Sequence, residues 1–368
     1  MMFDFPTFRH VNWLLDLERP AYDLSSSNII PEWKDYARTY VDDSLIREGN
    51  PRGGSELKGY LSESYGVDQG RIVITNGTSE ANTLAFVASL RKGDHVLVEK
   101  PVYSPLIEFP RAMGCRISFI KRRPDDYRFD LRELRTKLEE GIDLLVMQNP
   151  NNPTGRAVFR EDLAALASLL SEFDVPVLSD EIYRDFTLGP GTGERMEPAV
   201  PSMAGMFEKA IVTSSVTKVY GASGLVTGWL IAPRRIANHA RKAKSYMVPM
   251  VCHMGNRLAY HILRDRDKVL PGAFSELREK LRLVSQWAAG RPDVHWSEPD
   301  GCAIGFLRYD HDVPSTEMAA VLYERYDTKV VPGEFFHIEK GFRIGLSRPY
   351  DEIKGGLTMI DRCLDDLS

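Results

Sequence analysis

Asp143-Leu-Leu-Val-Met-Gln-Asn-Pro-Asn-Asn-Pro-Thr-Gly155 is the stretch that decides the fold, because it joins a short apolar run to a polar loop rich in Asn and Pro. Apolar runs of the same kind recur on both sides of it, at 71–75, 95–99, 116–120, 175–179, 210–214 and 224–231. Helical patterns separate most of these runs, at 79–90, 130–139, 160–172 and 203–208. This alternation is typical of a mostly parallel sheet covered by helices. The sequence therefore predicts an α/β protein whose large domain has three layers around a seven-stranded sheet.

The C-terminal third of the chain predicts a second, smaller α+β domain. A long helical segment at 233–289 is expected to be interrupted near Pro249 and Pro271. Short apolar runs interleaved with helices follow it, at 294–297, 303–307, 329–331 and 342–346. A chain of 368 residues has room for two such domains. We expect residues 45–255 to form the large domain, and residues 1–44 and 256–368 to form the small domain with an N-terminal arm.

Composition excludes several classes of function. The chain is 43% hydrophobic and 27% charged, as in ordinary globular proteins, and its net charge of -5 argues against a nucleic-acid or anionic membrane surface. The four cysteines lie far apart without a C-x-x-C pair, so neither a metal site nor a disulfide framework is expected. The chain shows no signal-peptide pattern and no apolar stretch of membrane-spanning length. We therefore expect a cytoplasmic protein that binds neither nucleic acid nor membrane.

Polar and aromatic residues follow five of the predicted strands, whose carboxyl ends should meet at one edge of the sheet. These segments are Asn76-Gly77-Thr78-Ser79, Pro101-Val102-Tyr103, Asn149 to Gly155, Asp180-Glu181-Ile182-Tyr183 and Ser215-Val216-Thr217-Lys218. Each has an ordinary explanation, since Gly-Thr-Ser or Asp180 can simply cap a helix and most lysines lie on the surface. A carboxylate after an apolar strand would nevertheless be buried and would need a cationic partner. Five matches in chain order favour one shared ligand.

Pyridoxal 5'-phosphate is the cofactor whose chemistry uses this combination. Its strength as an electron sink depends on a carboxylate that keeps the pyridine nitrogen protonated, and Asp180 suits that role. We expect Lys218 to hold the cofactor as a Schiff base and, once displaced by substrate, to move the α-proton. Backbone N–H groups and hydroxyls at a helix start can bind a phosphate. The other expected contacts are Asn152 and Tyr183 on the phenolic oxygen, Tyr103 on the ring, and Gly77, Thr78, Ser79 and Ser215 on the phosphate.

At these residues the sequence resembles the class I/II aminotransferases of fold type I, from about residue 45 to the C-terminus. The motifs that carry the resemblance are Asn76-Gly-Thr-Ser-Glu80, Lys100-Pro-Val-Tyr103, Asn149-Pro-Asn-Asn-Pro-Thr-Gly155, Ser179-Asp-Glu-Ile-Tyr183, Ser215-Val-Thr-Lys218, Gly224, Gly228-Trp229 and Phe342-Arg-Ile344. The resemblance implies a homodimer with its active site at the subunit interface. It also implies that Arg343, with Asn152, binds the substrate α-carboxylate, for which a guanidinium fork is well suited. The alternative for Arg343 is a surface salt bridge.

Two positions depart from the family pattern. Val226 stands where relatives usually have an arginine on the cofactor phosphate, and Glu48 stands about where they often have a tyrosine that reaches the partner's phosphate. Both changes weaken the expected grip on the phosphate. The Ser25-Ser-Ser-Asn28 arm, followed by Asn50-Pro-Arg-Gly53, is similar to capreomycidine synthase-like members, which use the fold for a cyclisation.

Three functions remain open on these grounds. The first is an aminotransferase that moves an amino group between an L-amino acid and a 2-oxo acid. The second is a β-elimination lyase or a cyclase on the same site, which need not hand on an amino group. The third is a ligand-binding module that kept the fold. The presence of Lys218, Asp180, Asn152 and Arg343 together argues against the third.

Overall fold

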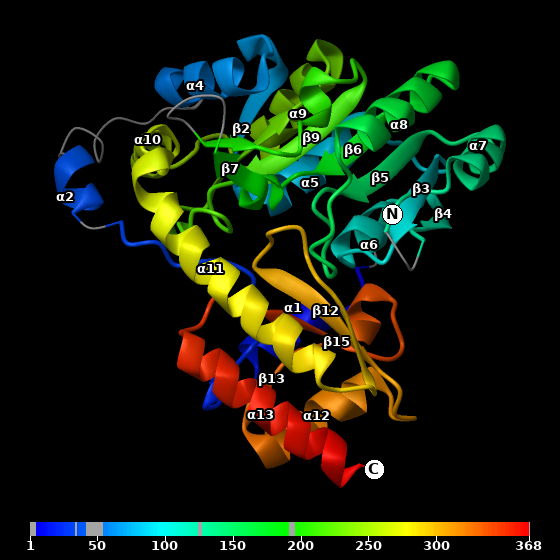
Figure 1. The fold of residues 1–368 in the computed structure, drawn as a ribbon. Coiled ribbons are helices and arrows are strands. Elements are labelled where there is room, and N and C mark those ends of the chain that lie inside the picture. The colour runs from blue at the N-terminus through cyan, green and yellow to red at the C-terminus, as the bar shows by residue number, and fades with distance from the viewer. Residues whose placement is uncertain (1–4, 34, 42–53, 124–126, 191–195, 368) are drawn as a thin grey trace.

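The computed structural model describes residues 5–33, 35–41, 54–123, 127–190 and 196–367. Glu48 and the Asn50–Gly53 loop lie outside the described residues. A large upper domain and a smaller lower domain are joined by one long helix that runs between them (Figure 1). In the described part of the chain no helix is both long enough and apolar enough to cross a membrane.

The large domain contains a seven-stranded sheet, as predicted. Its strands, in spatial order, are β2 (Ile72–Asn76), β10 (Thr227–Ile231), β9 (Ala210–Ser215), β6 (Val177–Asp180), β5 (Leu144–Gln148), β3 (His95–Lys100) and β4 (Arg116–Lys121). Only β10 runs antiparallel to its neighbours. It begins at Thr227 rather than at Gly224, because Val226 turns the chain with a φ of 47° just before it. The mostly parallel α/β fold is thus confirmed.

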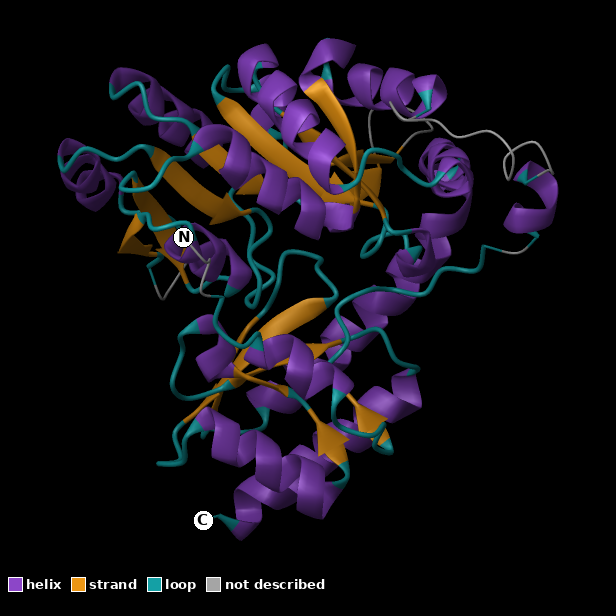
Figure 2. Ribbon diagram, turned by 180° about the vertical axis from the view of Figure 1, so that it is seen from behind, coloured by secondary structure: helices purple, strands orange, loops and turns teal. Residues whose placement is uncertain are grey.

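Helices cover both faces of this sheet (Figures 1 and 2). Alternate strand residues point to opposite faces, so Leu144 and Val146 pack with one apolar cluster, and Leu145 and Met147 with the other. The first cluster includes residues of α5 (Gly77–Ser89), α6 (Pro105–Ala112) and α9 (Arg234–Met247), and the second includes residues of α4 (Ser55–Tyr65), α7 (Leu131–Glu139) and α8 (Arg160–Glu172). The predicted helix at 203–208 is wrong, because only Met203–Gly205 forms a short 3-10 turn, capped by Ser202.

The long helical segment breaks twice, as expected, but only the break near Pro249 lies at a predicted position, because the other lies at Asp265. After α9 the chain passes Pro249 and enters α10 (His253–Arg264), which is followed by α11 (Arg266–Ala289). Pro271 lies inside α11 without ending it. A proline removes one backbone hydrogen bond, and the buried side chains of Leu270 and Phe274 hold the helix in place on either side. The expected interruption at Pro271 is therefore wrong.

The small domain contains a four-stranded antiparallel sheet in the order β11 (Val294–Ser297), β12 (Ile304–Tyr309), β15 (Phe342–Gly345) and β14 (Val331–Pro332). Helices α12 (Ser315–Tyr326) and α13 (Tyr350–Asp366) lie below it (Figure 1). The remaining strands are the pair β7 (Leu188–Pro190) and β8 (Met196–Pro198), and the parallel pair β1 (Tyr22–Asp23) and β13 (Thr328–Lys329).

The N-terminal arm lies against the small domain and reaches the large one. It carries α1 (Arg9–Leu15), β1 and α2 (Tyr36–Tyr40). The indole of Trp13 donates to the carbonyl of Val330 at 2.7 Å. Further along, the arm crosses β15 so closely that a Cβ on Gly345 would lie 1.5 Å from the Ser26 carbonyl oxygen. The arm therefore passes directly over the strand that carries Arg343.

Candidate active site

Asp180 stands at the carboxyl end of β6, buried to 2% exposure. Its Oδ2 accepts from Asn82 Nδ2 at 3.0 Å and Gln148 Nε2 at 3.3 Å, and its Oδ1 accepts from the Ile182 N–H at 3.1 Å. Burial raises the pKa of Asp180 to about 6. Among the described residues no cationic side chain forms an ion pair with it. A buried carboxylate in this state favours a cationic partner.

The groups around Asp180 are themselves held rigidly. The Gln148 N–H donates to Glu99 Oε1 at 2.6 Å, and Glu99 pairs at 2.5 Å with Arg122, both side chains being fully buried. Asn82 accepts from the Thr213 hydroxyl at 2.6 Å. Sequence reasoning did not include these supporting residues. Asn82 alone had a signal, because it lies four residues after Thr78 and so on the same face of α5.

Lys218 lies a few residues after β9, and its Nζ donates to the Ser27 hydroxyl at 2.9 Å. Burial, together with the positive charge of the nearby Arg343, lowers the pKa of Lys218 to about 8, although the negative charge of Asp180 acts in the opposite direction. The backbone keeps Ser27 in place, because Ile29 N donates to the Lys218 carbonyl at 3.2 Å. A Cβ on Gly221 would lie only 2.4 Å from the Ile29 carbonyl oxygen, so the two segments can approach only with glycine there. Ser27 was missed as a site residue, although its Ser-rich segment was noted.

Arg343 is a buried guanidinium, 1% exposed, on β15. Nη1 donates to Asn152 Oδ1 at 3.1 Å, and Nη2 donates to the Ser25 carbonyl at 2.7 Å. In the described part of the chain its Nε has no hydrogen-bond partner and no carboxylate pairs with it. A surface salt bridge, the alternative for this residue, is therefore not what the structure shows. A buried cation of this kind calls for an anionic ligand.

Two predicted tyrosines line the same region. Tyr183 is 2% exposed, and burial raises its pKa to about 12, while the nearby Arg343 and the Ser27 hydroxyl act to lower it. Burial also raises the pKa of Tyr103. The negative charge of Asp180 acts in the same direction, and the positive charge of Arg343 acts to lower this pKa. The Ser27 hydroxyl that acts on Tyr183 is the same group that accepts from Lys218 Nζ. The structure thus brings both tyrosines close to the charged groups.

The predicted phosphate contacts lie at the start of α5 and the end of β9. Gly77 opens α5 with a φ of 73°, and the buried hydroxyl of Thr78 has no partner among the described residues. Ser79 is exposed, and the Ser215 hydroxyl lies 2.7 Å from that of Thr217. A Cβ on Gly77 would lie 3.6 Å from Val226 Cγ1, so Val226 stands beside this helix start and brings no charge to it.

Comparison with known proteins identifies the chain's relatives. The family model described as "Aminotransferase class I and II" matches residues 14–358. The chain belongs to this family. It is 27% identical over 323 residues to a capreomycidine synthase from Streptomyces vinaceus, covering 87% of this chain and 81% of that protein. It is 26% identical over 337 residues to an aspartate aminotransferase from Streptomyces avermitilis, covering 86% of this chain and 81% of that protein.

Solved structures agree on the fold of this class I and II aminotransferase family member. A PLP-dependent aminotransferase from Streptococcus suis superposes with a TM-score of 0.88, covering 99% of both chains at 24% identity. The predicted family is confirmed, and the predicted similarity to capreomycidine synthase is confirmed by the relative from Streptomyces vinaceus. At these identities the substrate of the chain is left open.

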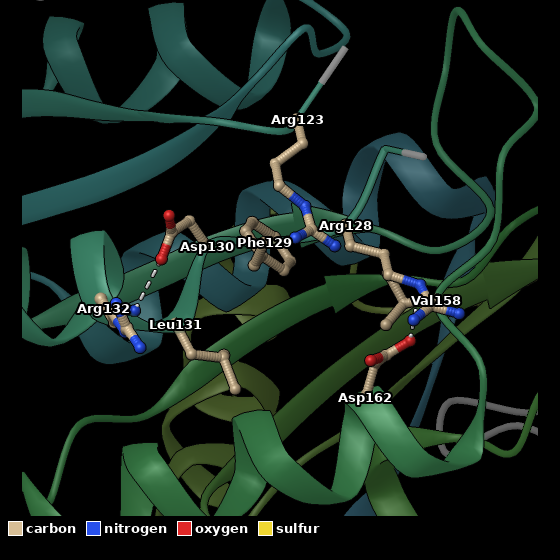
Figure 3. A pocket seen from close by; sticks show the side chains of 8 residues that line it. All are labelled: Arg123, Arg128, Phe129, Asp130, Leu131, Arg132, Val158 and Asp162. Carbon is tan, nitrogen blue, oxygen red and sulfur yellow. Dashed lines mark hydrogen bonds and ion pairs between the residues drawn. The ribbon is translucent and has the colours of Figure 1, made fainter. Parts of the chain in front are cut away.

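A separate pocket of about 470 Å³ lies away from these residues, beside α7 and α8 (Figure 3). Arginines dominate it, but Arg128 already pairs with Asp162 at 3.2 Å, and Asp130 caps α7 through the Arg132 N–H at 2.8 Å. None of the predicted site residues lines it. The described residues include no cluster of His, Cys, Asp or Glu side chains suited to a metal ion.

Proposed function

We propose that this family member is a pyridoxal-phosphate-dependent aminotransferase that moves an amino group between an L-amino acid and a 2-oxo acid. One observation carries the proposal: two buried groups of opposite charge, Asp180 and Arg343, each form no ion pair with a side chain among the described residues. Leaving single charges buried is costly, so such groups are expected where ligands supply the counter-charge. A protonated ring nitrogen would satisfy Asp180, and an α-carboxylate would satisfy Arg343.

The residues present fit the cofactor at each of its polar ends. Thr78 offers a buried hydroxyl that has no partner among the described residues, at a helix start where the N–H groups of the first turn of α5 could also bind a phosphate. Ser79 and Ser215 would add hydroxyls to the phosphate. Tyr183 and Asn152 would hydrogen-bond the phenolic oxygen, and Tyr103 would lie on the ring. These assignments remain those proposed from the sequence.

When bound, pyridoxal phosphate withdraws electrons from the α-carbon of an attached amino acid. Asp180 would hold the proton on the pyridine nitrogen, and its rigid partners Asn82 and Gln148 would keep it in position. Arg343 would bind the α-carboxylate with the two N–H groups of its fork, while Asn152 orients the guanidinium.

Lys218 would bind the cofactor through Nζ and later move the proton at the α-carbon. A pKa of about 8 leaves roughly a tenth of such amines neutral at pH 7, far more than for an ordinary lysine. The Ser27 hydroxyl would act as a positioning residue, because it holds Nζ at 2.9 Å. We also propose a cytoplasmic homodimer, as the family resemblance and the sequence suggest.

A β-elimination lyase or a cyclase on the same site is a second candidate. Val226 favours it, since an uncharged side chain beside Gly77 weakens the hold on a cofactor that is not covalently attached. Transfer of an amino group passes through such a state, whereas elimination and cyclisation need not. The similarity to capreomycidine synthase supports the same candidate.

A single assay separates the two candidates. Purified protein is incubated with a panel of L-amino acids, with and without a 2-oxo acid acceptor. We expect a new oxo acid whose formation requires the acceptor and is matched by the aminated acceptor. Ammonia and an oxo acid formed without any acceptor would instead establish elimination, consumption of the amino acid with neither product would indicate cyclisation, and either result would contradict transfer.

A further inference from the structure

His10, on α1 of the N-terminal arm, is a buried side chain whose polar atoms are unused. It is 4% exposed, and among the described residues neither Nδ1 nor Nε2 has a hydrogen-bond partner. A buried polar group without a partner destabilises the folded protein, and an apolar side chain of similar size would avoid that cost. A ligand that supplies the missing hydrogen bonds would remove it.

The neighbours of His10 include residues of the proposed active site. Its ring lies edge-on to the Tyr103 ring, with centroids 5.8 Å apart, and edge-on to the Phe336 ring at 5.3 Å. The same Phe336 ring lies 5.4 Å from the guanidinium carbon of Arg343. His10 and Arg343 therefore share one aromatic neighbour, and His10 also contacts Tyr103, the residue proposed to lie on the cofactor ring.

Room for a side chain exists beside the imidazole. A cavity of about 410 Å³ is lined by His10 together with Phe8, Phe109 and Phe335. The aromatic rings would enclose the carbon skeleton of a substrate. Other hydrogen-bonding side chains also line the cavity, including Arg9, Glu108, Glu334 and His337, but among the lining residues His10 is the one hydrogen-bonding side chain that is buried. An amino acid whose carboxylate lies on Arg343 would extend its side chain from the α-carbon into the surrounding region, where the arm provides one wall.

We propose that His10 is a specificity-determining residue that hydrogen-bonds a neutral polar group, a hydroxyl or a carboxamide, in the side chain of the substrate. This inference rests on the proposed function, because it concerns the substrate of the same site. Burial and the positive charges of Arg343 and Lys218 lower the pKa of His10, so its imidazole is neutral at neutral pH. A neutral imidazole has one donor and one acceptor, which a hydroxyl or a carboxamide complements. A carboxylate can only accept and an ammonium group can only donate, so each would leave one ring nitrogen of His10 without a partner.

Matched substrate pairs test the proposal. L-Tyrosine with L-phenylalanine, L-glutamine with L-methionine, and L-threonine with L-valine differ mainly in the polar group. Dissociation constants are measured from the absorbance change of the bound cofactor, with no acceptor present. We expect the unmodified protein to bind the polar member about tenfold or more tightly in at least one pair. His10→Leu should reduce that preference to about twofold or less, and His10→Gln or His10→Asn should partly restore it.

His261→Leu is the matched control. His261 on α10 is also buried, at 5%, and also lacks partners for both ring nitrogens among the described residues, but it stacks on Tyr40. Its charged neighbours, Arg264, Arg257, Glu56 and Asp265, are not predicted site residues. This variant should keep the substrate preference of the unmodified protein.

The outcomes separate this inference from the proposed function. If His10→Leu keeps the preference, if the unmodified protein prefers no polar member, or if L-glutamate binds better than L-glutamine, the inference about His10 is wrong. Acceptor-dependent formation of an oxo acid would still support the aminotransferase in any of these cases. Conversely, a polar preference that is lost in His10→Leu would support the inference even in a protein that eliminates rather than transfers.

Discussion

Replacing Asp180 by asparagine removes the negative charge while nearly keeping the shape of the side chain. The pKa of about 6, against an ordinary 3.8, means that burial disfavours the carboxylate by about 2 pKa units, or about 3 kcal/mol at neutral pH. A positive charge on the bound cofactor would offset this cost of keeping Asp180 ionised. We therefore expect Asp180→Asn to weaken cofactor binding about 100-fold and to lower turnover by several orders of magnitude, each tenfold being about 1.4 kcal/mol.

The same shift makes the cofactor-free protein sensitive to pH. Because the folded pKa lies above the unfolded value of 3.8, the carboxyl group contributes stability below about pH 4 that is lost as the pH rises through about 6. The variant lacks this contribution. The unfolding free energy of the unmodified protein minus that of Asp180→Asn should fall by about 3 kcal/mol in total, from its value well below pH 4 to its value well above pH 6. Between pH 5 and pH 7.5 this difference should fall by about 1.4 kcal/mol. Denaturant unfolding of both cofactor-free proteins measures it.

Glu181→Gln is the control for this experiment. Glu181 is the adjacent buried carboxylate, but it accepts from the Met203 N–H at 2.9 Å and lies 3.7 Å from Arg184. The affinity of Glu181→Gln for the cofactor should stay within about threefold of the affinity of the unmodified protein. Near-normal turnover and affinity in Asp180→Asn, or an equal loss of affinity in Glu181→Gln, would refute the role of Asp180.

The other predictions concern the carboxylate, the lysine and the phosphate. Arg343→Ala should raise the KM for amino acids about 100-fold while the absorbance of the bound cofactor stays normal, and Arg343→Lys should recover only part of this because an ammonium cannot reproduce the fork; an unchanged KM would move the carboxylate site elsewhere. Ser27→Ala should lower kcat about fivefold with little change in KM, as the loss of one hydrogen bond implies, and Ser27→Thr should restore it; normal kcat in Ser27→Ala would show that Lys218 needs no such partner. Val226→Arg should slow the loss of the amino form of the cofactor in equilibrium dialysis, with Val226→Gln as the uncharged control, because the half-exposed position of Val226 leaves room for a longer side chain; equally tight retention by the unmodified protein would show that another group already holds the phosphate.

Much of the large domain could be predicted because its signals are local. Short apolar runs such as 144–147, followed by polar loops, specify buried parallel strands, and their carboxyl ends necessarily meet at one edge. That geometry alone placed Asp180, Lys218 and Asn152 in one region before the structure was known. The predicted helix at 203–208 failed because a short polar and apolar mixture does not distinguish a helix from a turn.

The supporting residues could not be predicted because their partners are remote in sequence. Ser27 meets Lys218 across 191 residues, and Asn82 meets Asp180 across 98. No periodic pattern encodes such contacts. The role proposed for His10 likewise depends on its contacts with Tyr103 and Phe336, which lie in the large and the small domain. The role proposed for Ser27 follows from its hydrogen bond to Lys218, and the role proposed for His10 follows from its burial and its two ring nitrogens without a partner among the described residues.

The covalent link to Lys218 is the central claim, and borohydride reduction followed by peptide mapping tests it most directly. Protein loaded with pyridoxal phosphate should absorb as a yellow species and lose that colour on reduction. The cofactor should then be found attached to Nζ of Lys218, and Lys218→Ala should take up no label. A label on another lysine, such as Lys244, which pairs with Glu80 at 2.9 Å, would contradict the account.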